Sequence, residues 1–441
     1  MKKILAGILS AATVLTLTGL TGCKENEGAG DGEVTDNDEV LTILAWGDNA
    51  DITNMVKVFL EKKGYDESKV QIQRCGTGGG TASAAYEQYL GDAKADADLM
   101  CLEADWILDW INDDSRTSPM SSLDISESNL ANPYSYTVAV GKNTDGVLKG
   151  VSFQAAPGGF VYRADLAKQY LGVNNPDEMQ AKVKDWASLE ATAKEYKDAS
   201  GKALLSTEAG LWQVYQYNRT TPWVQNDTLQ MGEAESFYDL AKTYYDNGYI
   251  TKNEQWNAAW YASVANGDCL GEFLPTWGMT DVDDGMLDSF TNGVDATADL
   301  AFCEGPQFYA WGGTWLGVSA RCNSKTLAKE FVEFFTCQDD GMKAYTEYTG
   351  DFCNNSKVMS EVVAAGHTNK FLVDGQDQFK TFLEAAPKVN LDGKLTRYDA
   401  KIKGFFNDSV IAYMTDKMSK DEAIEDFKNN VSAAYTNLTV E

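Results

Sequence analysis

Short apolar segments alternate with amphipathic helical segments near the start of the chain, and this order limits the fold more than any other feature. Segments 40–46, 70–75 and 97–102 have the length and apolar content of buried strands. Apolar residues recur at helical spacing between them, over 52–60 and 82–90. Strand–helix–strand order favours right-handed crossovers and a parallel sheet. The sequence therefore predicts an α/β fold.

A second α/β region is expected to begin near Pro157. A length of 441 residues suggests two or three domain-sized units. Helical patterns cover 186–197 and 235–247, and the last third of the chain reads as mainly helical. Further strands are predicted at 159–162, 203–206, 269–274, 300–303 and 315–319.

The first 22 residues are predicted to be an export signal. Lys2 and Lys3 precede an uncharged apolar segment, 4–20, and the ending Leu-Thr-Gly-Cys23 resembles a bacterial lipobox. That resemblance implies cleavage before Cys23 and a lipid anchor, with palmitate-type acyl chains, on its sulfur. An ordinary signal peptide with a chance cysteine and an uncleaved membrane helix are the alternatives. Residues 23–40 are acidic and poor in apolar side chains, so we expect a tether.

Charge and histidine content exclude several classes of function. Asp plus Glu total 66 against 37 Lys plus Arg, a net charge of −29 that disfavours nucleic acid as a partner. His367 is the single histidine, which argues against a histidine-based catalytic triad or a multi-histidine zinc centre. We predict no cofactor and no metal.

Seven cysteines follow Cys23 and could pair outside the cytoplasm. Their spacing contains no CxxC pair, so a structural zinc site is not expected. Three bridges are plausible, and fully reduced thiols are equally compatible: Cys75–Cys101, Cys303–Cys322 and Cys337–Cys353, with Cys269 single.

Polar and aromatic residues follow the first three strands. Trp46, Asp48 and Asn49 lie at the carboxyl end of the first strand, and Glu103 and Asp105 follow the third. The carboxyl edge of an open α/β sheet is where ligands bind, so we expect these residues to face one crevice. The glycine-rich segment 76–81 also invites a nucleotide interpretation, but it ends in Thr where the dinucleotide fingerprint needs Gly or Ala.

Tryptophans in polar surroundings suggest the chemistry of the ligand. Trp212, Trp277 and Trp311 lie beside Gly, Gln or Thr. An indole face matches the C–H face of a sugar ring, while acids and amides match its hydroxyls. Aromatics and acids with few cations suit a neutral polyol and suit an anion badly. We expect three other tryptophans to be core residues: Trp110, Trp186 and Trp256.

Several motifs together resemble a known family. The lipobox, the tether and the Trp-Gly-Asp48 loop precede the segment 157–166, PGGFVYRADL, and then 267–278, GDCLGEFLPTWG. Trp311-Gly312-Gly313 and a helix follow these motifs. The order of all these motifs is similar to the order found in extracellular solute-binding proteins of bacterial ABC importers. The likeness is to the carbohydrate-binding branch that includes maltose-binding protein. Arg163-Ala164 replaces the Asn-Lys common in that branch.

The resemblance implies a type II periplasmic-binding-protein-like fold with two hinged lobes. Lobe 1 would comprise 40–155 plus 306–365, and lobe 2 would comprise 156–305 plus 366–441. Lobe 1 would supply one wall of the ligand site, with Trp46, Asp48, Asn49, Glu103 and Asp105. Lobe 2 would supply the other wall, with Trp212, Trp277 and Tyr398. Trp311, Gly312 and Gly313 would lie near the chain crossing between them.

The sequence thus predicts a monomeric binding protein, not an enzyme. It would be held on the extracytoplasmic face of the cell membrane, capture a carbohydrate, expected to be an oligosaccharide, and pass it to ABC permease subunits. A binding protein for a peptide or polyamine is the alternative within the class. A secreted glycosidase or lyase, or an adhesin without a pocket, is the alternative from another class.

Overall fold

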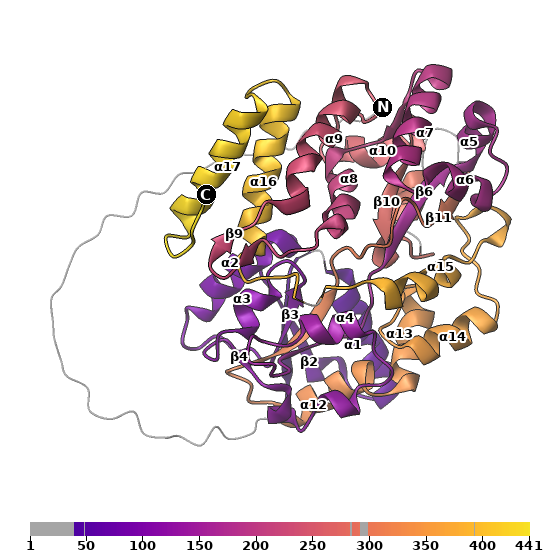
Figure 1. The fold of residues 1–441 in the computed structure, drawn as a ribbon. Helices are drawn as coiled ribbons and strands as arrows, with labels where there is room; N and C mark the ends of the chain where they lie inside the picture. The colour runs from indigo at the N-terminus through magenta and orange to yellow at the C-terminus, as the bar shows by residue number, and fades with distance from the viewer. Residues whose placement is uncertain (1–38, 48, 283–284, 292–298, 392) are drawn as a thin grey trace, which may run out of the picture. The chain divides into compact units, whose positions relative to one another are not determined.

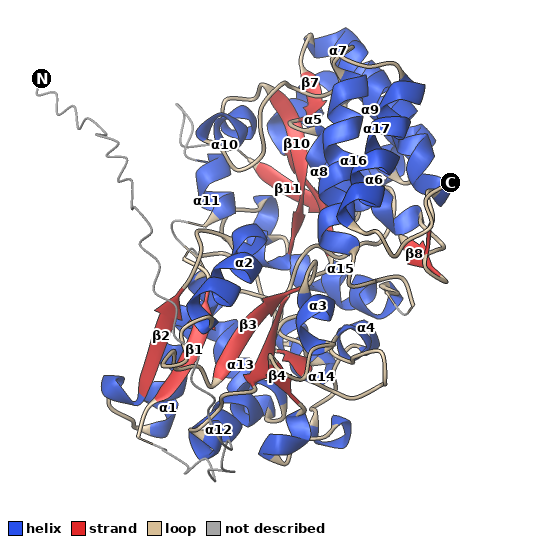
Figure 2. Ribbon diagram, turned by 90° about the vertical axis from the view of Figure 1, so that its left-hand side faces the viewer, coloured by secondary structure: helices blue, strands red, loops and turns tan. Residues whose placement is uncertain are grey.

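The computed structural model describes residues 39–47, 49–282, 285–291, 299–391 and 393–441. Figure 1 follows the chain through them, and Figure 2 shows the strands gathered into separate sheets. Among these residues, no helix has both the length and the apolar character needed to cross a membrane.

The first sheet is built from the N-terminal strands and one strand from much later in the chain. Its order is β2-β1-β3-β12-β4, with β5 also paired to β12. β1, β2 and β3 are parallel, whereas β12 runs antiparallel to β3, β4 and β5. The strands of this sheet are β1 (Leu41–Ala45), β2 (Val70–Arg74), β3 (Leu99–Glu103), β4 (Thr117–Ser118), β5 (Gly150–Ser152) and β12 (Thr314–Ser319).

The second sheet has the order β11-β6-β10-β7. β6 is antiparallel to β10 and β11, and β10 is parallel to β7. A separate hairpin joins β8 and β9. These strands are β6 (Gly158–Arg163), β7 (Ala203–Leu205), β8 (Val224–Gln225), β9 (Thr228–Leu229), β10 (Cys269–Pro275) and β11 (Leu300–Cys303). Both sheets are therefore mixed. The parallel arrangement predicted from the first three strands is confirmed for β1, β2 and β3, and the antiparallel strands come from later parts of the chain. The α/β prediction is also confirmed.

Helices make up most of the remaining structure. The C-terminal helices α16 and α17 pack together, and α16 also packs against α9 from the middle of the chain (Figure 1). The α-helices are α1 (Ala50–Lys63), α2 (Gly79–Leu90), α3 (Ile107–Ile111), α4 (Ser135–Val140), α5 (Ala164–Leu171), α6 (Pro176–Val183), α7 (Trp186–Ser200), α8 (Glu208–Tyr215), α9 (Glu235–Asp246), α10 (Ala258–Ala265), α11 (Met286–Thr291), α12 (Lys325–Thr336), α13 (Asp339–Thr349), α14 (Ser356–Ala364), α15 (Gln378–Ala385), α16 (Asp399–Met414) and α17 (Lys420–Ala434). Short 3₁₀ turns are η1 (Glu67–Lys69), η2 (Met120–Leu123), η3 (Glu127–Asn129), η4 (Gln216–Asn218), η5 (Gly232–Ala234), η6 (Thr276–Gly278), η7 (Val373–Gly375) and η8 (Ala386–Lys388).

Local sequence explains where α1 begins and ends. Asn49 precedes it, and the Asn49 side chain accepts a hydrogen bond from the backbone N–H of Ile52 at 3.0 Å. Gly64 ends it in the left-handed conformation, φ 69°, which glycine adopts without steric cost. The apolar stripe of the helix is buried as its spacing predicts.

Two chain segments run side by side between the sheets. The segment from β5 to β6 and the segment from β11 to β12 pair at Pro157 and Ala310. Trp311 N–H donates to Ala156 O at 2.9 Å, and Gly158 N–H donates to Tyr309 O at 3.1 Å. These paired crossings fix Trp311 next to the carboxyl end of the first sheet.

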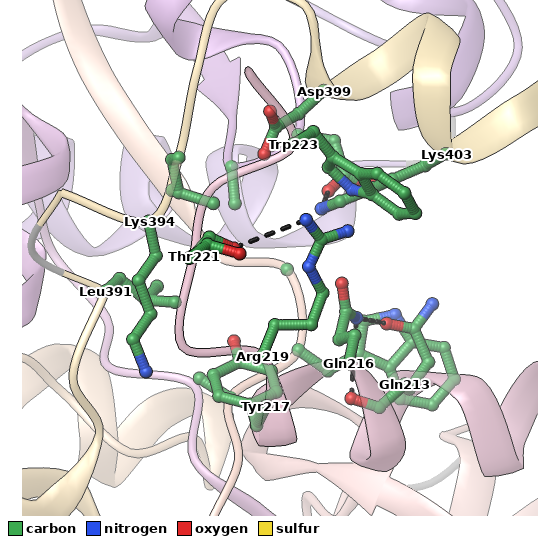
Figure 3. A pocket seen from close by; sticks show the side chains of 16 residues that line it. Gln213, Gln216, Tyr217, Arg219, Thr221, Trp223, Leu391, Lys394, Asp399 and Lys403 are labelled. Atoms are coloured by element: carbon green, nitrogen blue, oxygen red, sulfur yellow. Dashed lines mark hydrogen bonds and ion pairs between the residues drawn. The ribbon is translucent and has the colours of Figure 1, made fainter. Parts of the chain in front are cut away.

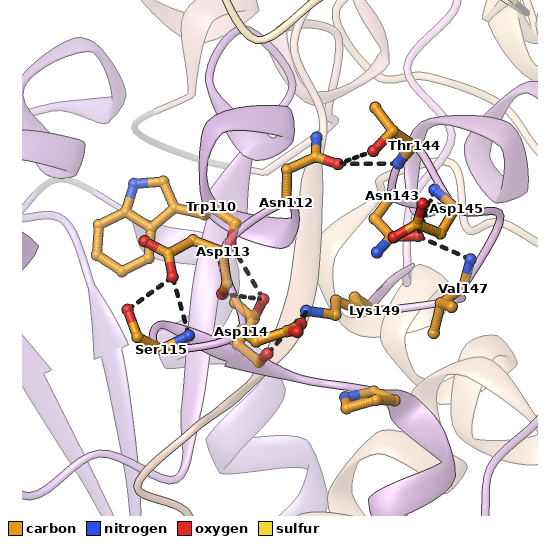
Figure 4. A network of polar contacts seen from close by, with 12 residues as sticks. Trp110, Asn112, Asp113, Asp114, Ser115, Asn143, Thr144, Asp145, Val147 and Lys149 are labelled. Atoms are coloured by element: carbon orange, nitrogen blue, oxygen red, sulfur yellow. Dashed lines mark hydrogen bonds and ion pairs between the residues drawn. The ribbon is translucent and has the colours of Figure 1, made fainter.

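A polar network holds the loops around β4 and β5 (Figure 4). Lys149 is almost fully buried, and its Nζ donates to Thr117 O at 3.0 Å and to Asp114 Oδ1 at 2.5 Å. Asn143 Oδ1 accepts from Val147 N–H at 2.8 Å. A buried ammonium group needs such partners, so this network supports the rim of the first sheet.

None of the seven described cysteines is paired in a disulfide. Six are buried and Cys337 is half-buried. The three suggested bridges are therefore not formed, and the reduced alternative describes this structure. The cysteines instead contribute small apolar side chains to the cores.

Candidate functional site

The carboxyl ends of β1 and β3 bring two of the predicted residues together. Trp46 follows β1 and Glu103 ends β3. Gly79 lies between them at the start of α2, where a methyl group would approach Glu103 Cγ to 3.4 Å and Trp46 Cε2 to 3.8 Å. Trp46 and Glu103, two residues expected to face one crevice, are therefore neighbours. Gly79 has no side chain to fill the space between them.

Three tryptophans from separate segments form what we call the tryptophan cluster: Trp256, Trp277 and Trp311. Trp277 lies in the turn after β10, and its Nε1 donates to Trp311 O at 3.0 Å. The ring centroids are 5.4–6.1 Å apart, and Trp256 stacks on Trp277 at an interplanar angle of 27°. These distances are typical of packed aromatic pairs.

Gly312 connects the tryptophan cluster to Glu103. A methyl group on Gly312 would lie 3.5 Å from Glu103 Oε1 and 3.5 Å from Trp277 Nε1. Gly312 has φ 66°, a conformation that disfavours other residues. Gly313 O accepts from Ala104 N–H at 3.2 Å, which ties this segment to the end of β3. Residues from both sheets therefore converge here.

Trp256 corrects one expectation from the sequence. It was expected in the core, but it is 46% exposed, among the largest exposed apolar side chains of the described residues. Its backbone has φ 72°, which is rare for a bulky residue and indicates local strain. Polar neighbours, Gln255 and Asn257, were the sequence signal for this position.

Other predicted residues have packing or capping contacts. Trp212 is 6% exposed and packs against Phe237 and Phe406, with centroids 4.9 and 4.6 Å away. Asn49 is buried as the cap of α1. The Tyr398 ring contacts Tyr435. The structure does not bring these residues to the tryptophan cluster, and Asp48 lies outside the described residues.

A cavity lies directly beside this site and shares Trp311 and Gly312 with it. The space within it is about 670 Å³ when the open solvent at its mouth is included. Figure 3 shows side chains from the α8 region, including Gln213 and Gln216, and from the segment before α16, including Leu391 and Lys394. Its lining comes from four stretches, within 104–105, 213–223, 310–312 and 391–403.

Charged groups are concentrated around the cavity. Lys403 Nζ donates to Asp105 Oδ1 at 2.5 Å. Burial raises the pKa of Glu103 to about 8, and the neighbouring Asp105 carboxylate adds to this effect. Burial also raises the pKa of Asp399 to about 6, although Lys403 opposes the shift. A protonated Glu103 can donate a hydrogen bond as well as accept one.

The described part of the chain contains no candidate metal-binding site. No group of three or more His, Cys, Asp or Glu side chains is placed there to hold an ion. The arrangement offers instead flat aromatic surfaces, one protonatable acid, amides and paired charges. That set is suited to non-covalent binding of a polar solute between elements of two sheets.

Two mixed sheets flanked by helices are the arrangement of type II periplasmic binding proteins. A family model described as bacterial extracellular solute-binding protein matches residues 54–370. The chain belongs to that family. Members serve ABC transporters as solute-binding components and are not catalytic, so the prediction that the chain is not an enzyme is confirmed.

Solved structures support the same fold at low sequence identity. A family 1 extracellular solute-binding protein has 16% identity and a TM-score of 0.73, over 89% of this chain and 99% of that one. A binding protein from Bifidobacterium animalis subsp. lactis Bl-04, in complex with β-1,6-galactobiose, has 17% identity and a TM-score of 0.69, over 91% and 99%. The galacto-N-biose/lacto-N-biose I-binding protein of Bifidobacterium longum has 16% identity and a TM-score of 0.68, over 92% and 100%.

These matches confirm the predicted type II fold class. A search of curated protein sequences finds no match.

Proposed function

We propose that this protein captures an oligosaccharide between two lobes and delivers it to the membrane subunits of an ABC transporter. Lobe 1 would comprise 40–155 plus 306–365, and lobe 2 would comprise 156–305 plus 366–441. The observation that carries the proposal is the tryptophan cluster, which lies next to Glu103 and to the cavity. The galactobiose and lacto-N-biose named for two similar structures are consistent with a saccharide.

Each group in the site has a role in this proposal. The exposed face of Trp256 would lie against a sugar ring, with Trp277 and Trp311 supporting it from behind. Glu103, with its pKa near 8, would be protonated at neutral pH and could donate to a sugar oxygen. Gln213 and Gln216 supply further amide donors and acceptors within the cavity.

Closure of the lobes would couple binding to delivery. Trp46 and Glu103 belong to the first sheet, whereas Trp256 and Trp277 belong to segments around the second. A ligand that touches both groups would favour the closed form, because only that form makes both sets of contacts. The closed form would then dock on the permease.

We also propose that Cys23 carries a lipid anchor and that the acidic segment 23–40 tethers the protein to the extracytoplasmic face of the membrane. The order of basic residues, apolar segment and lipobox-like ending supports this. Residues 1–38 lie outside the described part of the structure.

A single substitution tests the carbohydrate proposal. Trp277→Ala should weaken binding of a saccharide ligand by about 1–3 kcal/mol, roughly 5- to 150-fold in Kd, because it removes a large apolar surface and the support of Trp256. Ligands would first be found by thermal shift with a panel of oligosaccharides, peptides and polyamines. Affinity would then be measured by isothermal titration calorimetry.

Trp186→Ala is a matched control. Trp186 is half-buried, donates from Nε1 to Gln307 at 2.9 Å and lies outside the tryptophan cluster. It should lower stability without changing affinity. An unchanged Kd in a folded Trp277→Ala protein would remove the tryptophan cluster from the site.

A further inference from the structure

Arg219 is a buried cation that forms no ion pair with any carboxylate of the described residues. It lines the cavity and is 6% exposed. Its Nη2 donates to Thr221 O at 3.3 Å and Gln230 O at 3.2 Å, and its guanidinium carbon lies 3.5 Å from the centre of the Trp223 ring. Figure 3 shows the guanidinium between Thr221 and Trp223. Nη1 has no hydrogen-bond partner among the described residues.

The carboxylates near Arg219 do not neutralise it directly. Asp399 and Glu233 exert a favourable field on it, but within the described residues neither forms an ion pair with the guanidinium. Asp399 accepts instead from Thr396 N–H at 3.1 Å and from Thr396 Oγ1 at 2.5 Å. Burial lowers the pKa of Arg219 to about 10, so the group is still charged at neutral pH.

Among the side chains that line the cavity, cations exceed acids by one, in contrast to the chain as a whole. Glu103 and Glu233 lie nearby but outside this lining. The lining contains Arg219, Lys394 and Lys403 against Asp105 and Asp399, a local balance of +1, whereas the chain carries −29. Lys403 pairs with Asp105, but Lys394 has no ion-pair partner among the described residues. Two cations, Arg219 and Lys394, are therefore left for a ligand.

Physical chemistry favours an anion at this position. A buried charge is costly unless it is paired and hydrogen-bonded. The planar guanidinium presents a fork of donors that matches a carboxylate or a sulfate, and such charge-assisted bonds are stronger than bonds to a neutral hydroxyl. Trp223 holds the guanidinium plane from one side, which leaves its edge to bind.

We infer that the solute is an acidic saccharide, and that Arg219 and Lys394 bind its anionic group. This inference rests on the proposed carbohydrate-binding function and narrows its ligand class. The cavity and the tryptophan cluster share Trp311, so one ligand could place a sugar ring on the indoles and its anionic group in the cavity. The composition of the chain predicted a neutral ligand, so this inference of an acidic ligand is the opposite of that expectation.

Matched ligand pairs test this inference. Calorimetry would compare neutral disaccharides with counterparts that differ only in one group, a uronate carboxylate or a 6-sulfate in place of the 6-hydroxyl. The acidic member of a pair should bind about tenfold more tightly or better, and this preference should shrink as salt is added. Whether the uronate or the sulfate is preferred identifies the source of the charge.

Three variants connect the preference to the residues. Arg219→Gln should reduce the ratio of acidic to neutral affinity by about tenfold. Because Arg219 also supports two backbone carbonyls, Lys394→Met, at a half-buried position, is the second variant and should reduce the ratio as well. Lys401→Met is the matched control, because Lys401 is exposed on α16 and lies 5.8 Å from the Tyr435 ring instead of in the cavity.

The outcomes separate the two levels of the proposal. If the neutral members bind as tightly as the acidic ones, or if the folded Lys394→Met protein keeps the full preference, the inference is wrong and carbohydrate binding stands. If no saccharide of either kind stabilises the protein, the proposed function fails together with it.

Discussion

Glu272 provides a quantitative test of how burial controls this protein's stability. It lies within β10, the central strand that pairs with β6 and β7, and its side chain is fully buried. Its carboxyl oxygens accept from Trp260 Nε1 at 3.1 Å and from Phe273 N–H at 3.1 Å. Burial raises the pKa of Glu272 from 4.5 to about 8, although these hydrogen bonds oppose the shift.

The sign of the effect on stability follows from proton linkage. The folded protein holds the Glu272 proton up to about pH 8, while the unfolded chain releases it near pH 4.5. The stabilising contribution is therefore complete below about pH 4.5 and is lost as the pH rises towards 8. One pKa unit corresponds to about 1.4 kcal/mol, so the full loss has an upper limit of about 5 kcal/mol. Structural relaxation around the charge should reduce it.

Glu272→Gln isolates this contribution. Glutamine keeps an acceptor for Trp260 and cannot ionise, so the variant should lack this part of the pH dependence. Urea unfolding of both proteins at pH 5 and pH 9 would measure it. We expect the free energy of unfolding of the variant, relative to the original protein, to increase by about 2–4 kcal/mol between these pH values. Glu195→Gln, at a site exposed on α7, is the control and should show no such increase.

Other titrating groups are common to both proteins and cancel in the difference. Parallel stability curves for Glu272→Gln and the original protein would show that Glu272 is ionised in the fold at neutral pH, and the argument from burial would be refuted.

Two further predictions concern the cysteines. Membrane-associated protein should have the mass of residues 23–441 plus a diacylglyceryl group, and Cys23→Ser should release it; an unmodified mass would disprove the anchor. A chain beginning at Lys24, unfolded without reductant, should titrate with seven thiols, because all seven described cysteines are free. A count of five or fewer would demonstrate disulfides.

The sequence predicted most elements because their signals are local. The helical stripe of α1 and the apolar runs of β1 and β10 depend only on periodicity and length, which neighbouring residues determine. Strand direction was not predictable in the same way. β12 pairs antiparallel with β3 although more than 200 residues separate them, and no local pattern specifies that pairing.

The proximity of two predicted site residues followed from their positions in the fold. Trp46 and Glu103 were expected together because they follow strands of one sheet, and the structure brings them together. Trp212 was grouped with Trp277 and Trp311 because it lies beside a polar residue, Gln213, yet the structure packs Trp212 in an aromatic core. Neighbours in sequence do not report which face of α8 meets α16, so burial of that indole had to come from tertiary structure.

Arg219 shows why net composition is a weak guide to a binding site. A charge of −29 is an average over the chain, and long-range fields of exposed acids are screened by salt over about 10 Å. A buried cavity is governed instead by the few groups that the fold places around it, where interactions are less screened. Here the fold brings Arg219 from the turn after α8 to Lys394 and Lys403 from segments much later in the chain. The positive charge of the side chains that line the cavity is therefore a product of tertiary structure, and the inferred acidic ligand follows from this lining and not from the composition of the chain.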